Sequence, residues 1–281
     1  MKVLVTGSSG QLGSTVVKNL KAHHHTVYGI DVIPSDTTDE LIDLKNADAV
    51  LTASRGVDAI IHTAAVHGKH YALGYPREAF IETNIGGTLN LLNACVKNAI
   101  SKFLFTSTTS IYGEAMVNNK RAVWVDESLI IEPRDIYDIT KQAAEHLCRD
   151  FFYKEGLQAS VYRVARFLPE DDNLKINHRI YRGLDERDGA EALRSALDIC
   201  FEKFEVFNIS AGSPFTRDEL TQIKHDPTPV ILKHYPDAAD IYAARGWKFP
   251  GSIDRVYVSD KAKQYLGYQP VYTFGYLLHN L

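Results

Sequence analysis

The chain has 281 residues, of which 45% are apolar and 23% charged, as expected of an ordinary soluble globular protein. A formal net charge of −4 and a pI near 6.3 give no reason to expect nucleic acid or a membrane surface as a partner. No apolar run approaches the ~18 residues of a membrane span, and a strand begins within two residues of the start, so we expect neither a membrane segment nor a signal peptide. Cys95, Cys148 and Cys200 are widely spaced and indicate buried hydrophobes of a cytoplasmic protein, not a disulfide framework.

The first predicted elements surround a glycine-rich turn. Residues 2–6 form a short apolar run typical of a parallel strand, and an amphipathic helix follows Gly13. Between strand and helix, Gly7, Gly10 and Gly13 allow a tight turn and the close approach of a pyrophosphate, which the helix amino terminus attracts. We therefore expect dinucleotide binding here; the alternative is a merely structural glycine turn.

The second predicted strand, residues 26–30, ends at Asp31. An acidic residue about twenty positions past the glycines accepts hydrogen bonds from the adenosine ribose, and its charge repels a 2′-phosphate. Asp31 therefore favours NAD over NADP, unless it is only a turn aspartate. The three histidines at 23–25 point in different directions, so we expect no metal site.

A helix near residues 46–54 and a third strand at 57–61 come next. Ala64 and Ala65 follow that strand and let a cofactor pass close to the backbone. His67, Lys69 and His70 fall in a predicted loop, for which solvent exposure is favoured over substrate contact. A long helix is predicted over 80–99, and Asn84 lies on it.

The fourth predicted strand, 102–107, leads into a run of hydroxyl side chains from Thr106 to Ser110. Open α/β folds bind ligands at the carboxyl ends of their strands, so this run marks a site unless it is only a β-rich strand end. After a loop at 126–133, a helix over 137–154 carries Tyr137 and Lys141 on one face. A nearby ammonium favours the phenolate and lowers the pKa of a tyrosine; the alternative is a solvated helix face.

Strands that alternate with helices, the fifth at 157–164, predict an α/β fold with a Rossmann-type, doubly wound parallel sheet. We expect residues 1–165 to form the NAD-binding domain and 166–281 a small substrate-binding lobe, with a strand at about 204–209 returning to the sheet. The lobe is predicted to contain a loop at 169–173, and helices at 188–201, 216–220, 229–235, 237–244 and between Ser259 and Gly267.

Taken together, these motifs resemble the extended short-chain dehydrogenase/reductase family, which includes sugar-nucleotide epimerases, dehydratases and uronate dehydrogenases. The resemblance covers most of the chain and rests on residues 6–13, 62–65, 84–92, 106–113, 137–141 and 259–270. It implies that Tyr137 is the general acid/base, that Lys141 binds the nicotinamide ribose, and that Thr108 bonds the reacting oxygen. It also implies that Asp43 and Leu44 lie against adenine.

The resemblance makes NAD the expected cofactor. The expected cofactor-binding residues are Gly7, Gly10, Gln11, Leu12, Gly13, Asp31, Asp43, Leu44, Ala64, Ala65, Asn84, Tyr137 and Lys141. Relatives often form homodimers through a four-helix bundle, for which the helices that contain Phe80 and Tyr137 are the candidates.

The chain departs from the family after the fifth strand. Residues 166–169 replace an asparagine-containing run that lies near substrate phosphate in many relatives, and the segment from Arg166 to Asp188 is short. Epimerases carry a longer substrate-binding insertion there, so the arrangement is more similar to uronate dehydrogenases. The expected substrate is compact and sugar-like, with an acidic group as one option.

Thr108, Thr109, Ser110 and Arg166 are the expected substrate contacts. The alternative for Arg166 is an exposed arginine or a structural partner of Asp171 or Asp172. The predicted function is an NAD-dependent oxidoreductase acting at a hydroxyl or carbonyl carbon. A nucleotide-sugar 4-epimerase or dehydratase is the first alternative, and a non-enzymatic dinucleotide sensor is the second.

Overall fold

The computed structural model describes residues 1–167 and 169–281, so Leu168, in the run that departs from the family, lies outside the described residues. At its centre is a seven-stranded parallel sheet with strand order β3-β2-β1-β4-β5-β7-β8. The strands are β1 (Lys2–Thr6), β2 (Thr26–Asp31), β3 (Glu40–Leu41), β4 (Ala59–His62), β5 (Lys102–Thr108), β7 (Gln158–Val164) and β8 (Glu205–Ile209). The order reverses between β1 and β4, which confirms the predicted α/β, doubly wound Rossmann-type sheet.

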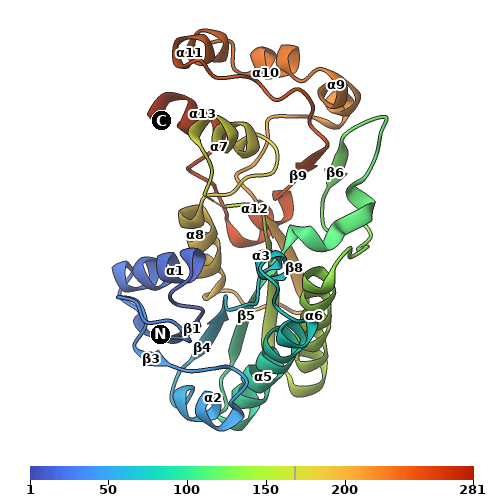
Figure 1. Cartoon of the computed structure of the whole chain (residues 1–281). Coiled ribbons are helices and arrows are strands. Elements are labelled where there is room, and N and C mark those ends of the chain that lie inside the picture. Colours follow the sequence, from blue (N-terminus) through green and yellow to red (C-terminus); the bar gives the residue numbers. More distant parts are fainter. Residues whose placement is uncertain (168) are drawn as a thin grey trace.

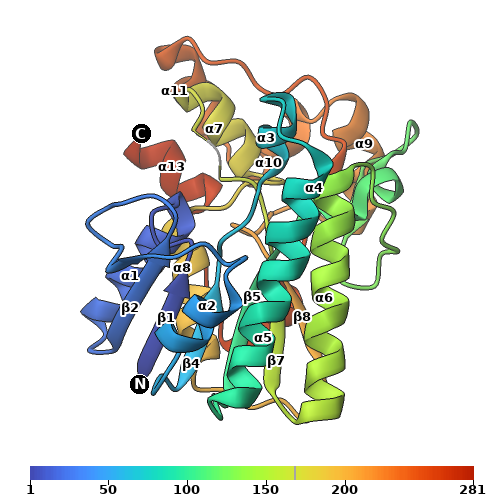
Figure 2. The same cartoon turned by 60° about the horizontal axis from the view of Figure 1, so that its bottom comes forward.

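The sheet has an apolar layer on each face because successive side chains of a strand point to opposite sides. In β1, Val3 and Val5 face one layer and Leu4 the other. The first layer is covered by α1 (Gln11–Ala22), α8 (Glu186–Ala196) and α12 (Asp260–Leu266). The second is covered by α2 (Ala47–Ala53), α5 (Thr88–Lys97) and α6 (Ile136–Glu155), and α5 and α6 lie side by side (Figure 2).

The helix predicted over 80–99 has an irregular first half. It begins with α4 (Arg77–Phe80), continues as the π-helical segment η1 (Ile81–Gly87), and ends as α5. Backbone angles stay helical through both junctions, so the three pieces form one rod. Asn84 lies inside the π-helical segment. Such wide turns are rare and occur often at functional sites.

A second group of elements lies beyond the carboxyl ends of the strands (Figure 1). It contains α7 (Asp172–Arg179), η3 (Arg217–Glu219), α9 (Leu220–His225), α10 (Thr228–His234), α11 (Ala238–Arg245), α13 (Phe274–Asn280) and a parallel pair of strands, β6 (Val123–Val125) with β9 (Arg255–Tyr257). These elements share their own apolar core, which includes Ala122 from the first half of the chain. Since α8 and α12 pack on the main sheet and β8 belongs to it, the chain passes between the two groups of elements several times. The division into two domains at residue 166 stays a prediction.

Two segments predicted as loops contain helices. The segment with His67 forms α3 (Gly68–Ala72), whose first turn His67 caps by accepting a hydrogen bond from the Lys69 backbone N–H. The predicted loop at 169–173 ends early, because Asp171 caps α7 by accepting from Leu174 N–H at 3.0 Å. Both helices are too short for a clear apolar period, and β3, β6 and β9 were missed for the same reason.

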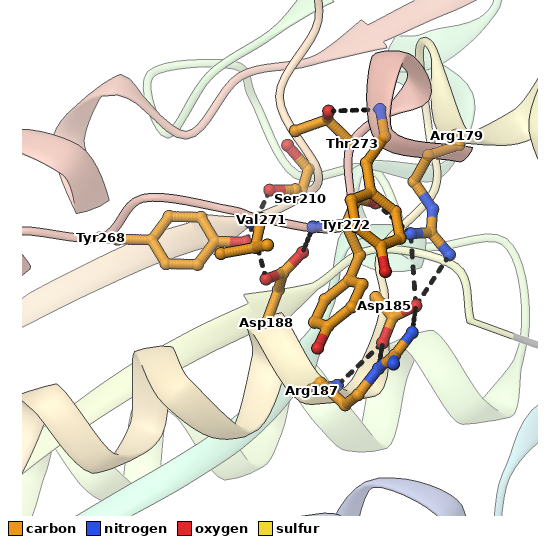
Figure 3. A network of polar contacts seen from close by, with 10 residues as sticks. Arg179, Asp185, Arg187, Asp188, Ser210, Tyr268, Val271, Tyr272 and Thr273 are labelled. Atoms are coloured by element: carbon orange, nitrogen blue, oxygen red, sulfur yellow. Dashed lines mark hydrogen bonds and ion pairs between the residues drawn. The ribbon is translucent and has the colours of Figure 1, made fainter. Parts of the chain in front are cut away.

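A polar network holds the segment before α13 against the amino-terminal end of α8 (Figure 3). The carboxylate of Asp188 accepts the backbone N–H groups of Val271 at 2.9 Å and Tyr272 at 3.0 Å. Asp185, the α8 cap, pairs with Arg179 of α7 at 3.4 Å. These bonds fix the second group of elements to α8, a helix that packs on the sheet.

Candidate active site

One large cavity, of about 990 Å³, lies at the carboxyl ends of the strands. Its walls come from the turns after β1, β2, β4, β5 and β7 and from the second group of elements. Ligand pockets typically have volumes of about 300–1,000 Å³. The cavity is therefore large enough for an extended ligand with a smaller molecule at its end.

The glycine turn forms one part of this wall. Gly7 has φ +72°, and a Cβ atom there would lie 2.5 Å from the Ala64 backbone nitrogen. A Cβ atom on Gly13 would lie only 2.0 Å from the Gly7 carbonyl oxygen. Gly10, Gln11 and Leu12 also line the cavity, where α1 starts without a side-chain cap. The backbone N–H groups at the start of α1 are thus available to a phosphate, as a dinucleotide requires.

Asp31 is held rigidly at the end of β2. One carboxylate oxygen accepts from Ser9 N–H at 3.0 Å, and the other accepts from Val32 N–H at 2.7 Å and Ile33 N–H at 3.1 Å. A carboxylate has roughly four acceptor positions, so capacity remains for a ribose hydroxyl. Asp31 lines the cavity together with Asp43, Leu44, Ala64 and Ala65.

Tyr137 and Thr108 both line the cavity. Tyr137 is buried in the first turn of α6, and Thr108 ends β5. Burial raises the pKa of Tyr137 well above 10, and the neighbouring Thr108 hydroxyl opposes part of that rise. Thr108 Oγ1 also accepts from Ser110 N–H at 3.1 Å, which fixes its rotamer. Because both side chains line the cavity, a substrate oxygen bound there has two candidate hydroxyl partners.

Lys141 lies one helical turn beyond Tyr137 and is also buried. Its Nζ donates to the Thr106 carbonyl at 2.6 Å and lies 4.3 Å from the centre of the Phe105 ring. Burial lowers the pKa of Lys141 from 10.5 to about 8. The predicted effect of the Lys141 ammonium on the pKa of Tyr137 stays a prediction.

The predicted substrate contacts occupy different positions in the wall. Thr109 is buried, and its hydroxyl donates to the Val164 carbonyl at 3.4 Å. Ser110 lines the cavity, and its backbone N–H donates to Thr108 Oγ1 at 3.1 Å. Arg166 lines the cavity too, but its Nε donates to Glu170 at 2.5 Å. Neither Asp171 nor Asp172 is the arginine's ion-pair partner within the described part of the chain.

Asn84 differs from the other predicted cofactor residues because its side chain is bonded to protein. Its Oδ1 accepts from Val66 N–H at 2.8 Å, and its Nδ2 donates to the Val66 carbonyl and to Thr140 Oγ1, each at 3.0 Å. Of the expected cofactor and substrate residues, it alone is absent from the described lining of the cavity. Its predicted contact with the cofactor stays a prediction; what Asn84 does here is fix the segment after β4 to α6.

Sequence reasoning missed the cavity residues that the second group of elements supplies. Arg182, Arg255 and Tyr257 line the cavity opposite the glycine turn. Arg255 pairs with Asp254 and lies near Met116, another lining residue. Strand β9, which carries Arg255, has three residues, and Arg182 follows a helix that was not predicted. No local sequence pattern indicated that either arginine would line the cavity.

Comparison with known proteins identifies the family. Residues 3–185 match the profile described as the NAD dependent epimerase/dehydratase family. The chain belongs to this family. The family is one of enzymes that depend on NAD, and the glycine turn and Asp31 fit that cofactor, so NAD is the cofactor of this chain.

Curated relatives of the family have different activities. An uncharacterized UDP-glucose epimerase, YtcB, from Bacillus subtilis is 33% identical over 58% of this chain and 55% of its own length. A 3-beta-hydroxysteroid dehydrogenase from Mycolicibacterium neoaurum is 34% identical over 51% of this chain and 41% of its own length. The chain thus spans about half the length of these relatives, so their activities are not assigned to it directly.

Solved structures cover the chain more fully. A UDP-N-acetylglucosamine 4-epimerase from Bacillus cereus is 26% identical, with a TM-score of 0.72 over 100% of this chain and 97% of that one. A short-chain dehydrogenase/reductase superfamily protein from Agrobacterium tumefaciens with bound NAD has a TM-score of 0.74 at 21% identity, over 100% and 95% of the two chains. A mutated uronate dehydrogenase has a TM-score of 0.71 at 18% identity, over 98% and 82%. At these lower identities the likeness shows the fold alone, the extended short-chain dehydrogenase/reductase fold.

Within the described ranges, no helix combines the length and the apolar character that crossing a membrane requires.

Proposed function

We propose that this chain is an NAD-dependent oxidoreductase acting at a hydroxyl or carbonyl carbon of a compact, anionic, sugar-like substrate. The observation that carries the proposal is the placement of Thr108 and Tyr137, with Lys141, in the cavity that the glycine turn also lines. The sensor alternative has no need of such a pair, because a protein that only binds NAD moves no substrate proton.

The chemistry divides among three side chains. Bound NAD supplies the hydride acceptor. Tyr137 takes the proton of the substrate hydroxyl, Thr108 holds the same oxygen, and Lys141 holds the nicotinamide ribose. For Tyr137 to act near neutral pH its pKa must fall, and Lys141, one turn along the same helix face, is the cation available to lower it. General acid–base catalysis of this kind contributes about 10²- to 10⁴-fold in rate.

Three arginines support an anionic substrate. Arg166, Arg182 and Arg255 line the cavity, and since Arg166 pairs with Glu170 and Arg255 with Asp254, Arg182 is the one of the three without an ion pair in the described part of the chain. A guanidinium presents a rigid fork of donors that matches a carboxylate or a phosphate. The short segment 166–188 supports a substrate without a nucleotide, because it offers little chain to enclose one.

A nucleotide-sugar 4-epimerase is the second candidate. It is favoured by the epimerases among the relatives, in particular the Bacillus cereus structure that covers the full chain. An epimerase uses the same residues but returns the hydride to its substrate, so it produces no net NADH. The arginines also suit the diphosphate of a nucleotide sugar.

Following NADH absorbance with sugar acids, free aldoses and nucleotide sugars separates the two candidates. Net NADH with a sugar acid or an aldose, abolished in Tyr137→Phe and weakened in Arg166→Ala, is the result we expect. Turnover of a nucleotide sugar alone, without net NADH, would replace the proposal by the epimerase. Wild-type levels of NADH formation by Tyr137→Phe would exclude Tyr137 as the acid/base.

We propose further that the protein is a homodimer. Apolar side chains are exposed along α5 and α6, including Leu89, Val96 and Ile139. Light scattering after gel filtration should give a molar mass twice that of one chain. Ile139→Asp should reduce this mass to that of a single chain. A wild-type monomer at micromolar concentration would contradict this.

A further inference from the structure

His67 lies against the acid/base residue and is not used by the chemistry above. Its ring centre is 4.9 Å from that of Tyr137, with an angle of 45° between the ring planes. His67 lines the same cavity as Thr108 and Tyr137. A substrate oxygen that joins the hydroxyl pair would therefore have this imidazole as a neighbour.

Several bonds fix the position of His67. Asn84 binds both backbone groups of Val66, the preceding residue, and joins it to Thr140 of α6. On the other side, the backbone N–H of His67 donates to His70 Nδ1 at 2.9 Å. The imidazole is thus placed from the same helix that carries Tyr137, so the two rings keep their relative position.

The hydrogen bonds also determine which ring nitrogen is free. His67 Nδ1 accepts from the Lys69 backbone N–H at 3.2 Å, so the proton of the neutral ring is on Nε2. Burial lowers the pKa of His67 to about 4, so the ring is neutral at neutral pH. It therefore offers one uncharged donor, the Nε2–H group, which suits a hydroxyl or carbonyl oxygen.

Capping alone does not explain a histidine at this position. Serine, threonine, aspartate and asparagine are the preferred residues for capping a helix amino terminus, and all are smaller. The imidazole adds a flat ring packed on Tyr137 and a donor, neither of which the five-residue helix α3 needs.

We infer that His67 is a substrate-specificity residue, whose Nε2–H donates a hydrogen bond to a sugar oxygen neighbouring the one held by Tyr137 and Thr108. The inference rests on the proposed function only in assuming that the sugar oxygen held by Tyr137 and Thr108 is the reacting one. The contact is with a sugar oxygen, which the oxidoreductase and the epimerase candidates share.

The test compares His67→Asn with His67→Ala. Asparagine keeps an acceptor for the Lys69 N–H group, so α3 stays capped, but it removes the imidazole donor. Both variants should lose at least tenfold in kcat/KM for the sugar, while the Kd for NAD changes less than twofold. His70→Ala, which breaks the other half of the capping pair, loosens α3 without removing the His67 donor.

If His67→Asn performs like the wild type while His67→Ala and His70→Ala are impaired, His67 only caps α3 and the inference fails. It also fails if both His67 variants retain full kcat/KM. A second measurement needs no turnover: in ¹⁵N-histidine NMR of the NAD complex, the His67 signal, assigned by its loss in His67→Asn, should shift when a sugar acid or nucleotide sugar binds. An unmoved signal at saturation overturns the inference, whereas a shift without NADH formation overturns only the proposed reaction.

Discussion

Glu145 of α6 and Arg163 of β7 form a buried ion pair, and removing Glu145 should destabilise the protein strongly. Arg163 donates to the two carboxylate oxygens of Glu145 at 3.0 and 2.7 Å, and both side chains are only 6% exposed. A third donor of Arg163 bonds the Tyr112 hydroxyl at 2.9 Å. Glu145→Ala leaves a buried guanidinium without its counter-charge.

The expected loss can be worked from these contacts. Breaking one side of a buried pair costs about 3–5 kcal/mol, and two hydrogen bonds to charged groups, at about 1.5–3 kcal/mol each, give a similar figure. A loss of about 4 kcal/mol is a large part of the roughly 5–15 kcal/mol that keeps a domain folded. Urea unfolding followed by circular dichroism measures it.

Two comparison variants make this measurement decisive. The double variant Glu145→Met/Arg163→Met removes both charges, so it should recover much of the lost free energy of unfolding. Asp260→Ala breaks an exposed pair with Lys263 and should cost about 1 kcal/mol at most. A loss below 1 kcal/mol for Glu145→Ala, equal to that of the exposed pair, would refute the reasoning.

Three further predictions concern the cavity. Because Asp31 repels a 2′-phosphate, NAD should bind at least tenfold tighter than NADP, about 1.4 kcal/mol; equal affinities in a titration would contradict this, and Asp31→Ala should narrow the gap. Tyr137→Phe should lose at least a hundredfold in turnover while it still binds NAD, and Thr108→Val should reduce turnover more than cofactor affinity, as steady-state kinetics and NAD titrations will measure. Burial holds the pKa of Lys141 near 8, below 10.5, so the folded protein releases this proton before the unfolded chain does. Lys141→Met should therefore raise the free energy of unfolding most below pH 8, and this gain should shrink as the pH rises from 8 to 10.5; a gain that is the same at pH 7 and pH 10 would exclude the pKa as its cause.

The sheet and one side of the cavity could be predicted from sequence because local patterns encode them. Short apolar runs followed by glycines, an aspartate or hydroxyls mark the carboxyl ends of strands, and parallel strands bring those ends to one edge. Asp31, Thr108 and Arg166 were each found in this way, at or just after the ends of three different strands, and all line one cavity.

The other side of the cavity depends on contacts between distant parts of the chain. Arg255 reaches it because β9 pairs with β6, more than one hundred residues earlier, and each strand has only three residues. The role of Asn84 also depends on distant partners, Val66 and Thr140. Neither pairing leaves a periodic signal, so propensity and spacing cannot reveal it.

The π-helical segment Ile81–Gly87 has a consequence for how this site can vary among related proteins. A π turn holds about one residue more than an α turn, so deleting one residue there would restore a regular helix. Everything before it would then rotate by about 100° relative to α5. The packing of α5 on the sheet would survive, while Asn84 would leave Val66 and the wall beside Tyr137 would be rebuilt. Single-residue insertions and deletions in this stretch are thus a route by which a lineage can change the cavity wall beside Tyr137 while the fold stays the same.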